Sequence, residues 1–193
     1  MENASESTIK GTGVVAGVAY AEAVWVRPRP ALPTEGSIDP EQASESEYNR
    51  FLAAVDTVAN RLEKRAAAAE GQAAEVLTAT AGMVKDRGWH KTVRKNIRTG
   101  RNAEFATVGA TDKFVTMFEA AGGVMAERTT DLKDVRDRVI AELRGEDEPG
   151  LPLVDGEAVL FADDLAPADT ATLDTKHIKA LVTELGGPSS HTA

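Results

Sequence analysis

The chain has 193 residues, of which 42% are hydrophobic and 27% charged, a balance typical of a globular protein with a sizeable core. It contains no cysteine, which excludes disulfides, thiolate catalysis and cysteine-based zinc sites. The net charge of -9 argues against nucleic-acid binding, and no signal peptide or run of ~20 apolar residues indicates secretion or a membrane span, so we expect a cytoplasmic protein.

Residues 9–26 consist of short β-branched runs punctuated by glycine, which predict two short strands joined by a glycine turn. Gly11 and Gly13 do not form a dinucleotide-binding motif, because no third glycine opens a helix at the required place. Three prolines within residues 28–33 then predict the end of the strand and a stiff linker.

Four amphipathic helical stretches follow. The first opens at Asp39-Pro40, an acidic cap followed by proline at the first helical position, and Gly71 is expected to end or kink it. The others run from about residue 73 to 97, from a cap at Asn102 to a break at Gly122-Gly123, and from about 124 to a close at Gly145. Their apolar stripes predict a four-helix bundle over residues 34–149.

After a linker at 146–155 the pattern becomes strand-like. A strand at 157–161, a short helix from Pro167 and a strand through 178–182 predict a parallel strand–helix–strand unit. We expect the opening strands to join this sheet. The predicted fold is therefore α/β or α+β: a small α/β domain formed by residues 9–33 and 150–193, interrupted by the helical subdomain 34–149.

The final loop carries the residues that favour chemistry. Neutral imidazole is a nucleophile near neutral pH, so His191 is a candidate phosphoryl acceptor. Gly186 and Gly187 allow close backbone approach to an anion, and Ser189 and Ser190 supply hydroxyl donors. From the residues alone, an incidental histidine in a glycine turn remains an open interpretation.

Other polar groups are weaker candidates. His90, beside Trp89 on a helix, is expected to pack, and His177 is expected to be solvated. The acidic residues 163–164 and Asp169 lie near His177 in sequence, but their spacing matches no metal cage. No strained nucleophile elbow or acid partner supports serine–histidine catalysis.

Several motifs resemble one family. Residues 186–192, Gly-Gly-Pro-Ser-Ser-His-Thr, resemble the phosphohistidine signature of phosphoenolpyruvate-utilising enzymes. Residues 11–20 are similar to the first hairpin of enzyme I of the sugar phosphotransferase system, residues 128–135 to its Arg-x-x-Asp-x-x-Asp-hydrophobic helix, and residues 164–170 to its Asp-Leu-x-Pro-x-x-Thr turn. These matches span the chain in the family's order.

The resemblance implies that His191 takes a phosphoryl group that originates from phosphoenolpyruvate and passes it to the histidine phosphocarrier protein HPr. It further implies that Thr170 orients His191, and that HPr docks on the helical insertion. A packing role is equally open for each residue that the resemblance suggests as an HPr contact: Met83, Val84 and Trp89 through apolar surface, and Arg128 through charge.

Two features depart from the family. Residues 85–88 read Lys-Asp-Arg-Gly where the family is usually acidic, which alters the charge facing HPr. The chain also stops two residues after His191, before the barrel domain that binds phosphoenolpyruvate and Mg²⁺ and mediates dimerisation in the family. We therefore expect this chain alone to be a monomer without its own cofactor, to lack phosphoenolpyruvate-dependent activity, and to retain mainly HPr binding.

Two alternatives remain open at this stage. The phosphohistidine domain of a pyruvate phosphate dikinase or phosphoenolpyruvate synthase carries a similar signature, although it lacks the helical insertion. A non-catalytic helical interaction module, with an incidental His191, is the second.

Overall fold

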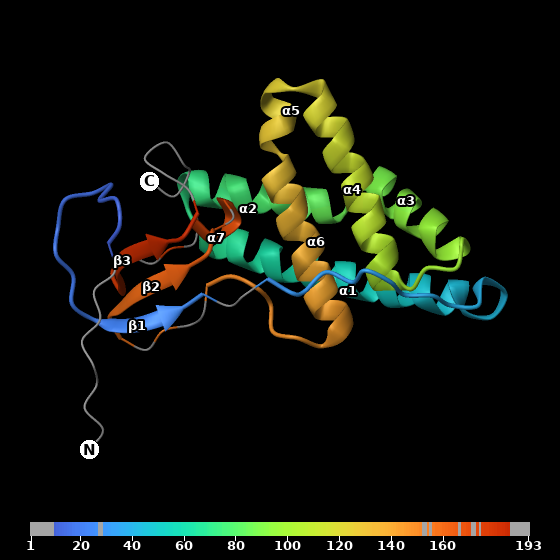
Figure 1. Cartoon of the computed structure of the whole chain (residues 1–193), viewed down its shortest axis with the longest axis horizontal. Coiled ribbons are helices and arrows are strands. Elements are labelled where there is room, and N and C mark those ends of the chain that lie inside the picture. The colour runs from blue at the N-terminus through green and yellow to red at the C-terminus, as the bar shows by residue number, and fades with distance from the viewer. Residues whose placement is uncertain are drawn as a thin grey trace, which may run out of the picture.

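The computed structural model describes residues 10–26, 29–151, 154, 156–165, 167–170, 173 and 175–185. A block of helices stands beside a small parallel sheet (Figure 1). The elements in chain order are β1 (Glu22–Trp25), α1 (Pro40–Ala68), α2 (Gly71–Val84), α3 (Arg87–Arg98), α4 (Ala103–Ala121), α5 (Gly123–Glu127), α6 (Thr129–Arg144), β2 (Ala158–Ala162), α7 (Pro167–Thr170) and β3 (Ile178–Thr183). The predicted combination of a helical block with an α/β part is confirmed, whereas the exact domain boundaries stay a prediction.

Helix α1 begins and ends where its local signals predict. The Asp39 carboxylate accepts a hydrogen bond from the Glu41 amide at 3.0 Å, and Pro40 is the first helical residue. The helix ends at Ala68, and α2 begins at Gly71, whose φ of 58° lies in the left-handed region that favours glycine. The predicted break at Gly71 is therefore confirmed.

The stretch predicted as one helix from 73 to 97 is two helices, α2 and α3. Asp86 lies between them and caps α3, because its carboxylate accepts a hydrogen bond from the Trp89 amide at 2.7 Å. Such a local bond competes with continuation of the helix. The break turns Trp89 into the core, where its side chain is 1% exposed.

The stretch predicted from 124 to 143 is also interrupted. Helices α5 and α6 meet at Arg128, and the Thr129 hydroxyl donates to the Ala126 carbonyl at 2.8 Å in that turn. Helix α6 ends as predicted at Gly145, which has a left-handed φ of 67°. All four predicted helical stretches are thus present, and two of them contain a turn.

The core lies between α1, α2, α3, α4 and α6. Its centre is aromatic: the Phe51 and Trp89 rings meet edge to face at 5.4 Å, and both side chains are fully buried. Burial of each such side chain stabilises the fold by about 1.5–3 kcal/mol. Aliphatic residues complete the cluster: Val55, Val58, Leu62, Leu77, Val84, Val93, Ile97, Val135 and Val139.

The sheet has the order β1-β2-β3 and is parallel throughout. This confirms the predicted strand–helix–strand unit and the pairing of the opening segment with it. Trp25, Phe161 and Val182 share a register across the three strands, and the Trp25 and Phe161 ring centroids are 5.5 Å apart. All three arrows point toward the helical block, so the carboxyl ends of the strands lie where sheet and helices meet (Figure 1).

The predicted hairpin in residues 9–26 is wrong for the described part of that segment. Only β1 is a strand there, and residues 11–20 form none. Their apolar side chains gain no burial from pairing: Val15 is 79% and Tyr20 98% exposed. β-branched composition favours a strand only where a partner and a covered face exist.

Helix α6 is crossed by the segment that leads from β1 to α1. The Arg144 guanidinium donates to the Ala31 carbonyl at 2.7 Å, and Arg29 lies 3.9 Å from the Asp137 carboxylate. These contacts tie the start of the chain to the helical block. None of the described helices is both long and apolar enough to cross a bilayer.

Candidate functional site

The candidate site begins where β2 and β3 end. The Glu184 amide donates to the Ala162 carbonyl at 3.0 Å, and the Leu185 amide donates to the Asp163 carbonyl at 2.7 Å. The segments that follow β2 and β3 therefore leave the sheet side by side, at the carboxyl edge where parallel sheets bind ligands. The predicted phosphate loop, Gly186, Gly187, Ser189, Ser190 and His191, follows directly and lies outside the described residues.

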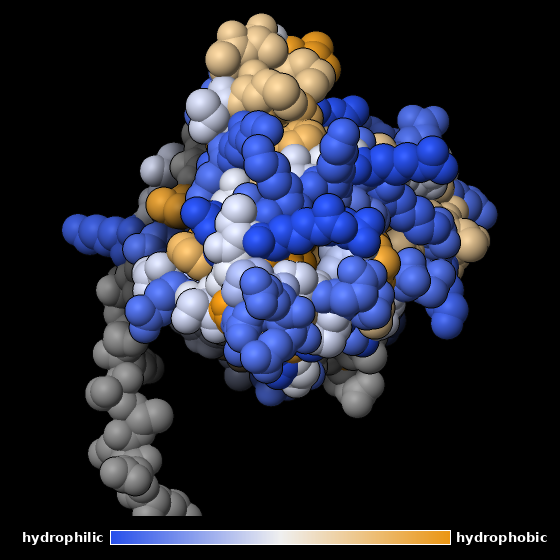
Figure 2. All heavy atoms as spheres, turned by 90° about the vertical axis from the view of Figure 1, so that its right-hand side faces the viewer, coloured by the Kyte–Doolittle hydropathy of each residue, from blue (hydrophilic) through white to orange (hydrophobic). Residues whose placement is uncertain are grey.

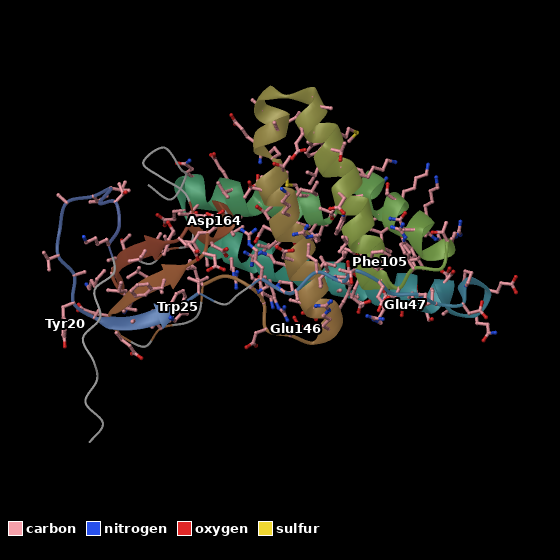
Figure 3. All side chains as sticks on the ribbon, in the orientation of Figure 1. Tyr20, Trp25, Glu47, Phe105, Glu146 and Asp164 are labelled. Carbon is pink, nitrogen blue, oxygen red and sulfur yellow. The ribbon has the colours of Figure 1, made fainter. Side chains whose placement is uncertain are left out.

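The turn after β2 brings Thr170 to the same edge. The Asp164 carboxylate accepts a hydrogen bond from the Leu165 amide at 2.9 Å, and the Leu165 side chain is fully buried. Helix α7 then runs from Pro167 to Thr170, whose carbonyl accepts from the Leu173 amide at 3.2 Å. Figure 3 shows Asp164 at the junction of sheet and helices. The predicted role of Thr170 toward His191 stays a prediction.

A buried arginine lies beneath this turn. The Arg138 side chain has no exposed surface and donates from Nε to Asp134 at 2.8 Å and from Nη2 to Asp169 at 2.7 Å. Its Nη1 donates to Glu148. Burial by itself would lower the pKa of Arg138, but the attraction of Asp134 and then Asp169 outweighs it and raises that pKa above its usual value. The guanidinium therefore stays charged.

Two further arginines extend the network at the surface. Arg65 lies 3.4 Å and Arg61 3.9 Å from Glu148, and Arg61 also pairs with Glu142 at 2.7 Å. Helix α1, helix α6 and the linker that carries Glu148 are thereby joined. Asp169 belongs to this charge network through its contact with Arg138. Among the described residues, no group of three potential metal ligands lies together.

Asp137 precedes Arg138 on α6 and has different partners. Its side chain is 1% exposed, and Oδ1 accepts from Arg136 Nε at 2.8 Å. Burial raises the pKa of Asp137, because it outweighs the hydrogen bond and attraction of Arg136 and the weaker attraction of Arg29. The ion-pair partners of this carboxylate are Arg136 on α6 and Arg29 in the segment after β1.

The structure corrects two of the suggested HPr contacts. Val84 is fully buried and Trp89 is 1% exposed, with its indole nitrogen donating to the Thr111 hydroxyl at 3.2 Å. Both are core residues, so neither presents apolar surface to a partner. Met83 is partly buried against the same core. Arg128 lies at the α5–α6 turn, 44% exposed and 3.4 Å from Asp131, and is accessible.

An exposed apolar tip lies close to Arg128 in the chain. Met117 near the end of α4 is 50% exposed, and Val124 and Met125 on α5 are 69% and 42% exposed. The apolar colours at the top of Figure 2 mark this end of the molecule. Met117, Val124 and Met125 are hereafter the apolar tip. The sequence interpretation missed them because it took its contact residues from the family resemblance, whereas the exposure of these three side chains depends on how the helices pack.

The two other histidines behave as expected. His90 is half-buried, its Nε2 lies 2.7 Å from the Val84 carbonyl, and its ring meets Phe51 edge to face at 5.3 Å. It packs, as predicted. His177 is exposed in the turn before β3, and its carbonyl accepts from the Ala158 amide at 3.0 Å.

Family comparisons divide the chain in the same way as the sequence motifs. Residues 10–128 match the PEP-utilising enzyme N-terminal family, where PEP is phosphoenolpyruvate, and residues 154–193 match the PEP-utilising enzyme mobile domain. The two matches lie on the two sides of the α6 segment that carries Arg138. The helical block and the candidate phosphate loop therefore each have a family counterpart.

Individual relatives agree with these matches. Phosphoenolpyruvate-protein phosphotransferases of Streptomyces coelicolor and Bacillus subtilis are 41% and 31% identical over 97% and 96% of this chain. The chain spans only 34% and 33% of their lengths.

Solved structures share the fold. A solution structure of enzyme I superposes with a TM-score of 0.78 at 26% identity, covering 93% of this chain and 74% of the other. The N-terminal domain of the nitrogen enzyme 1 superposes with a TM-score of 0.62 at 22% identity, over 93% of this chain and 75% of the other, which supports the fold alone.

Proposed function

Because this chain belongs to the family of PEP-utilising enzyme N-terminal domains, we propose that it is the phosphohistidine and phosphocarrier-docking part of a phosphoenolpyruvate-protein phosphotransferase. One observation carries the proposal: the Gly-Gly-Pro-Ser-Ser-His motif follows a parallel strand–helix–strand unit directly at its carboxyl edge. Relatives that match along the chain bear this enzyme's name, which favours it over the dikinase and interaction-module alternatives.

In the proposed reaction His191 is the nucleophile. One neutral ring nitrogen attacks the phosphorus atom, a nitrogen–phosphorus bond forms, and the bond from phosphorus to the donor breaks. With phosphoenolpyruvate the leaving group is the enolate of pyruvate, and with phosphorylated HPr it is the HPr histidine. Ser189, Ser190 and the backbone at Gly186-Gly187 would donate to the phosphoryl oxygens.

We assign to Thr170 the role of fixing the His191 ring through its hydroxyl. Its place on α7, at the carboxyl edge from which the phosphate loop departs, supports this role. Binding of phosphoenolpyruvate and Mg²⁺, and dimerisation, are proposed for the part of the whole protein that this chain does not span. Transfer from phosphoenolpyruvate then requires that part, whereas exchange with HPr uses residues present here.

HPr is proposed to dock on the helical block at the apolar tip and Arg128. Exposed apolar side chains beside an accessible cation are typical of a protein-binding surface. Residues 85–88, where the sequence departs from the family's usual acidic segment, make contacts within the helical block: Lys85 pairs with Glu63 at 2.6 Å, and Asp86 caps α3. That segment is therefore not required for the docking proposal.

Phosphorylated HPr tests the site assignment. Incubation with the chain should label His191, identified by mass spectrometry, and His191→Ala should abolish the label. His177→Ala is the matched control, because it removes an exposed histidine from the same part of the chain, and it should keep the label. Labelling of a residue other than His191 would refute the assignment.

Docking can be tested separately from transfer. Met125→Asp should weaken HPr binding at least tenfold in calorimetry, because it places a charge in the centre of an apolar contact. Val18→Asp is the control, since Val18 is fully exposed in the opening segment, and should bind like the parent chain. Equal affinity of both variants would remove the tip from the docking surface.

A further inference from the structure

Arg138 joins the helical block to the short helix that carries Thr170. We propose that Arg138 and Asp169 are positioning residues for phosphoryl transfer: their ion pair fixes α7, and through it the Thr170 hydroxyl, relative to His191. This inference rests on the function proposed above. It gives a functional role to the ion pair that connects α6 to α7.

The geometry of Arg138 suits this use. A guanidinium is planar, and its donors leave it in fixed directions. Here the directions lead to carboxylates from three separate segments: Asp134 on α6 itself, Glu148 on the linker, and Asp169 on α7. One rigid group therefore sets the relative position of all three segments.

Stability alone does not account for such a group. A buried ion pair is often no more stabilising than apolar residues of the same volume, because desolvation offsets its attraction. Its distinguishing property is direction. Asp169 is adjacent to Thr170 in a helix of only four residues. A contact that fixes the position of Asp169 therefore also restricts the position of the Thr170 backbone.

The backbone at Gly150 also packs closely against the Asp169 carboxylate. Gly150 has a φ of 108°, which favours glycine, and a methyl group on it would overlap the Asp169 carboxylate. The carboxylate thus lies between the Arg138 guanidinium and the backbone of the linker. Asp169 is 6% exposed, which agrees with a fixed position.

Small displacements matter in transfer reactions. A misplacement of about 1 Å of an orienting group lowers a rate by roughly a hundredfold. Without the ion pair, α7 would still pack against α2 and α6, but the carboxylate next to Thr170 would lose the guanidinium that sets its direction. We therefore expect a loss in kcat for phosphoryl transfer, with the KM for phosphorylated HPr unchanged, because HPr docks elsewhere.

Asp134 provides the matched control. It pairs with the same guanidinium at nearly the same distance and is as buried as Asp169, but it lies on α6, four residues before Arg138. Asp134→Asn and Asp169→Asn should therefore lower stability to a similar extent. Only Asp169→Asn weakens the connection to α7.

The experiment measures initial rates of His191 labelling against the concentration of phosphorylated HPr, together with the ring-nitrogen chemical shifts of His191. Asp169→Asn should lower kcat at least tenfold and change the shifts, whereas Asp134→Asn should lower kcat less than twofold. Asp169→Asn should also add little to the loss caused by Thr170→Ala, since it acts through that residue. Equal kcat values for the Asp169 and Asp134 variants would overturn the inference.

Arg138→Lys covers the case in which Asp169→Asn does not fold. It keeps a cation but loses the three-way fork, so kcat should again fall at least tenfold, and a parental kcat would contradict the positioning role. Absence of labelling in the parent chain has a different meaning, because it refutes the proposed function itself. The two failures are therefore distinguishable.

Discussion

Replacing Arg138 by methionine should cost more stability than any surface arginine. Methionine has a similar length and fills the space but carries no donor. In the parent chain the guanidinium pairs with three carboxylates: Asp134, which is 5% exposed, Glu148, which is 11% exposed, and Asp169, which is 8% exposed. Removal of one partner from a buried pair costs about 3–5 kcal/mol, because charge is left in a poorly solvated place.

The loss should lie within that range rather than above it. Glu148 keeps Arg65 at 3.4 Å and Arg61 at 3.9 Å, so part of its charge stays compensated. With a urea dependence of about 2 kcal/mol per molar, typical of small proteins, the unfolding midpoint at pH 7 should fall by roughly 1.5–2.5 M. Circular dichroism of the helical signal measures it directly.

Arg94→Met is the control for this substitution. Arg94 pairs at 3.4 Å with Glu45, which is 71% exposed, and lies over the Tyr48 ring at 4.8 Å. Exposed contacts of these kinds contribute about 1 kcal/mol. If Arg138→Met shifted the midpoint no more than Arg94→Met, the Arg138 network would not be a buried, charged connection between segments, and the reasoning about α7 would lose its basis.

Three further substitutions test local features of the helical block. Asp86→Ala should lower the free energy of unfolding by about 1 kcal/mol in urea titrations through loss of the α3 cap, whereas Asp86→Asn, also a good cap, should be nearly neutral. Thr111→Val should cost about 1–3 kcal/mol by the same measurement, because the buried Trp89 indole N–H loses its acceptor. The raised pKa of Asp137 means that protonation stabilises the folded state and that this contribution is lost as pH rises through the folded pKa. Asp137→Asn should therefore be more stable than the parent at pH 7, and the difference should shrink as pH falls toward 3.8; a difference that grows toward low pH would reverse the assigned sign.

Features that depend on neighbouring residues could be predicted from the sequence. The caps at Asp39 and Asn102 act within three residues, so the sequence contains all of their information. The strand–helix–strand unit could be predicted in the same way, because the spacing of its apolar residues changes between strand-like and helix-like at turn-forming residues. The breaks at residues 85–86 and 128 were missed because helical spacing of apolar residues continues across them, although Asp86 carried a capping signal.

Features that depend on distant residues could not be predicted. Arg138 contacts side chains 4, 10 and 31 positions away, and only the first of these follows from helix geometry. The same reason explains the errors at Val84 and Trp89, whose burial depends on how α2, α3 and α4 pack. Their hydrophobicity suits a core and a docking surface equally well.

Helix α6 gives the proposed docking and transfer sites a defined separation. Arg128 lies at its start, beside the apolar tip, and Arg138 lies ten positions later beneath α7, so the two points are about 15 Å apart along the axis. A domain of 100 residues has a radius of gyration of about 13 Å. A docked protein of that size can therefore contact the apolar tip and the edge where Thr170 lies at the same time. Because α6 is continuous between these points, the helix itself sets their separation. The ion pair of Arg138 with Asp169 then fixes the position of α7 relative to α6.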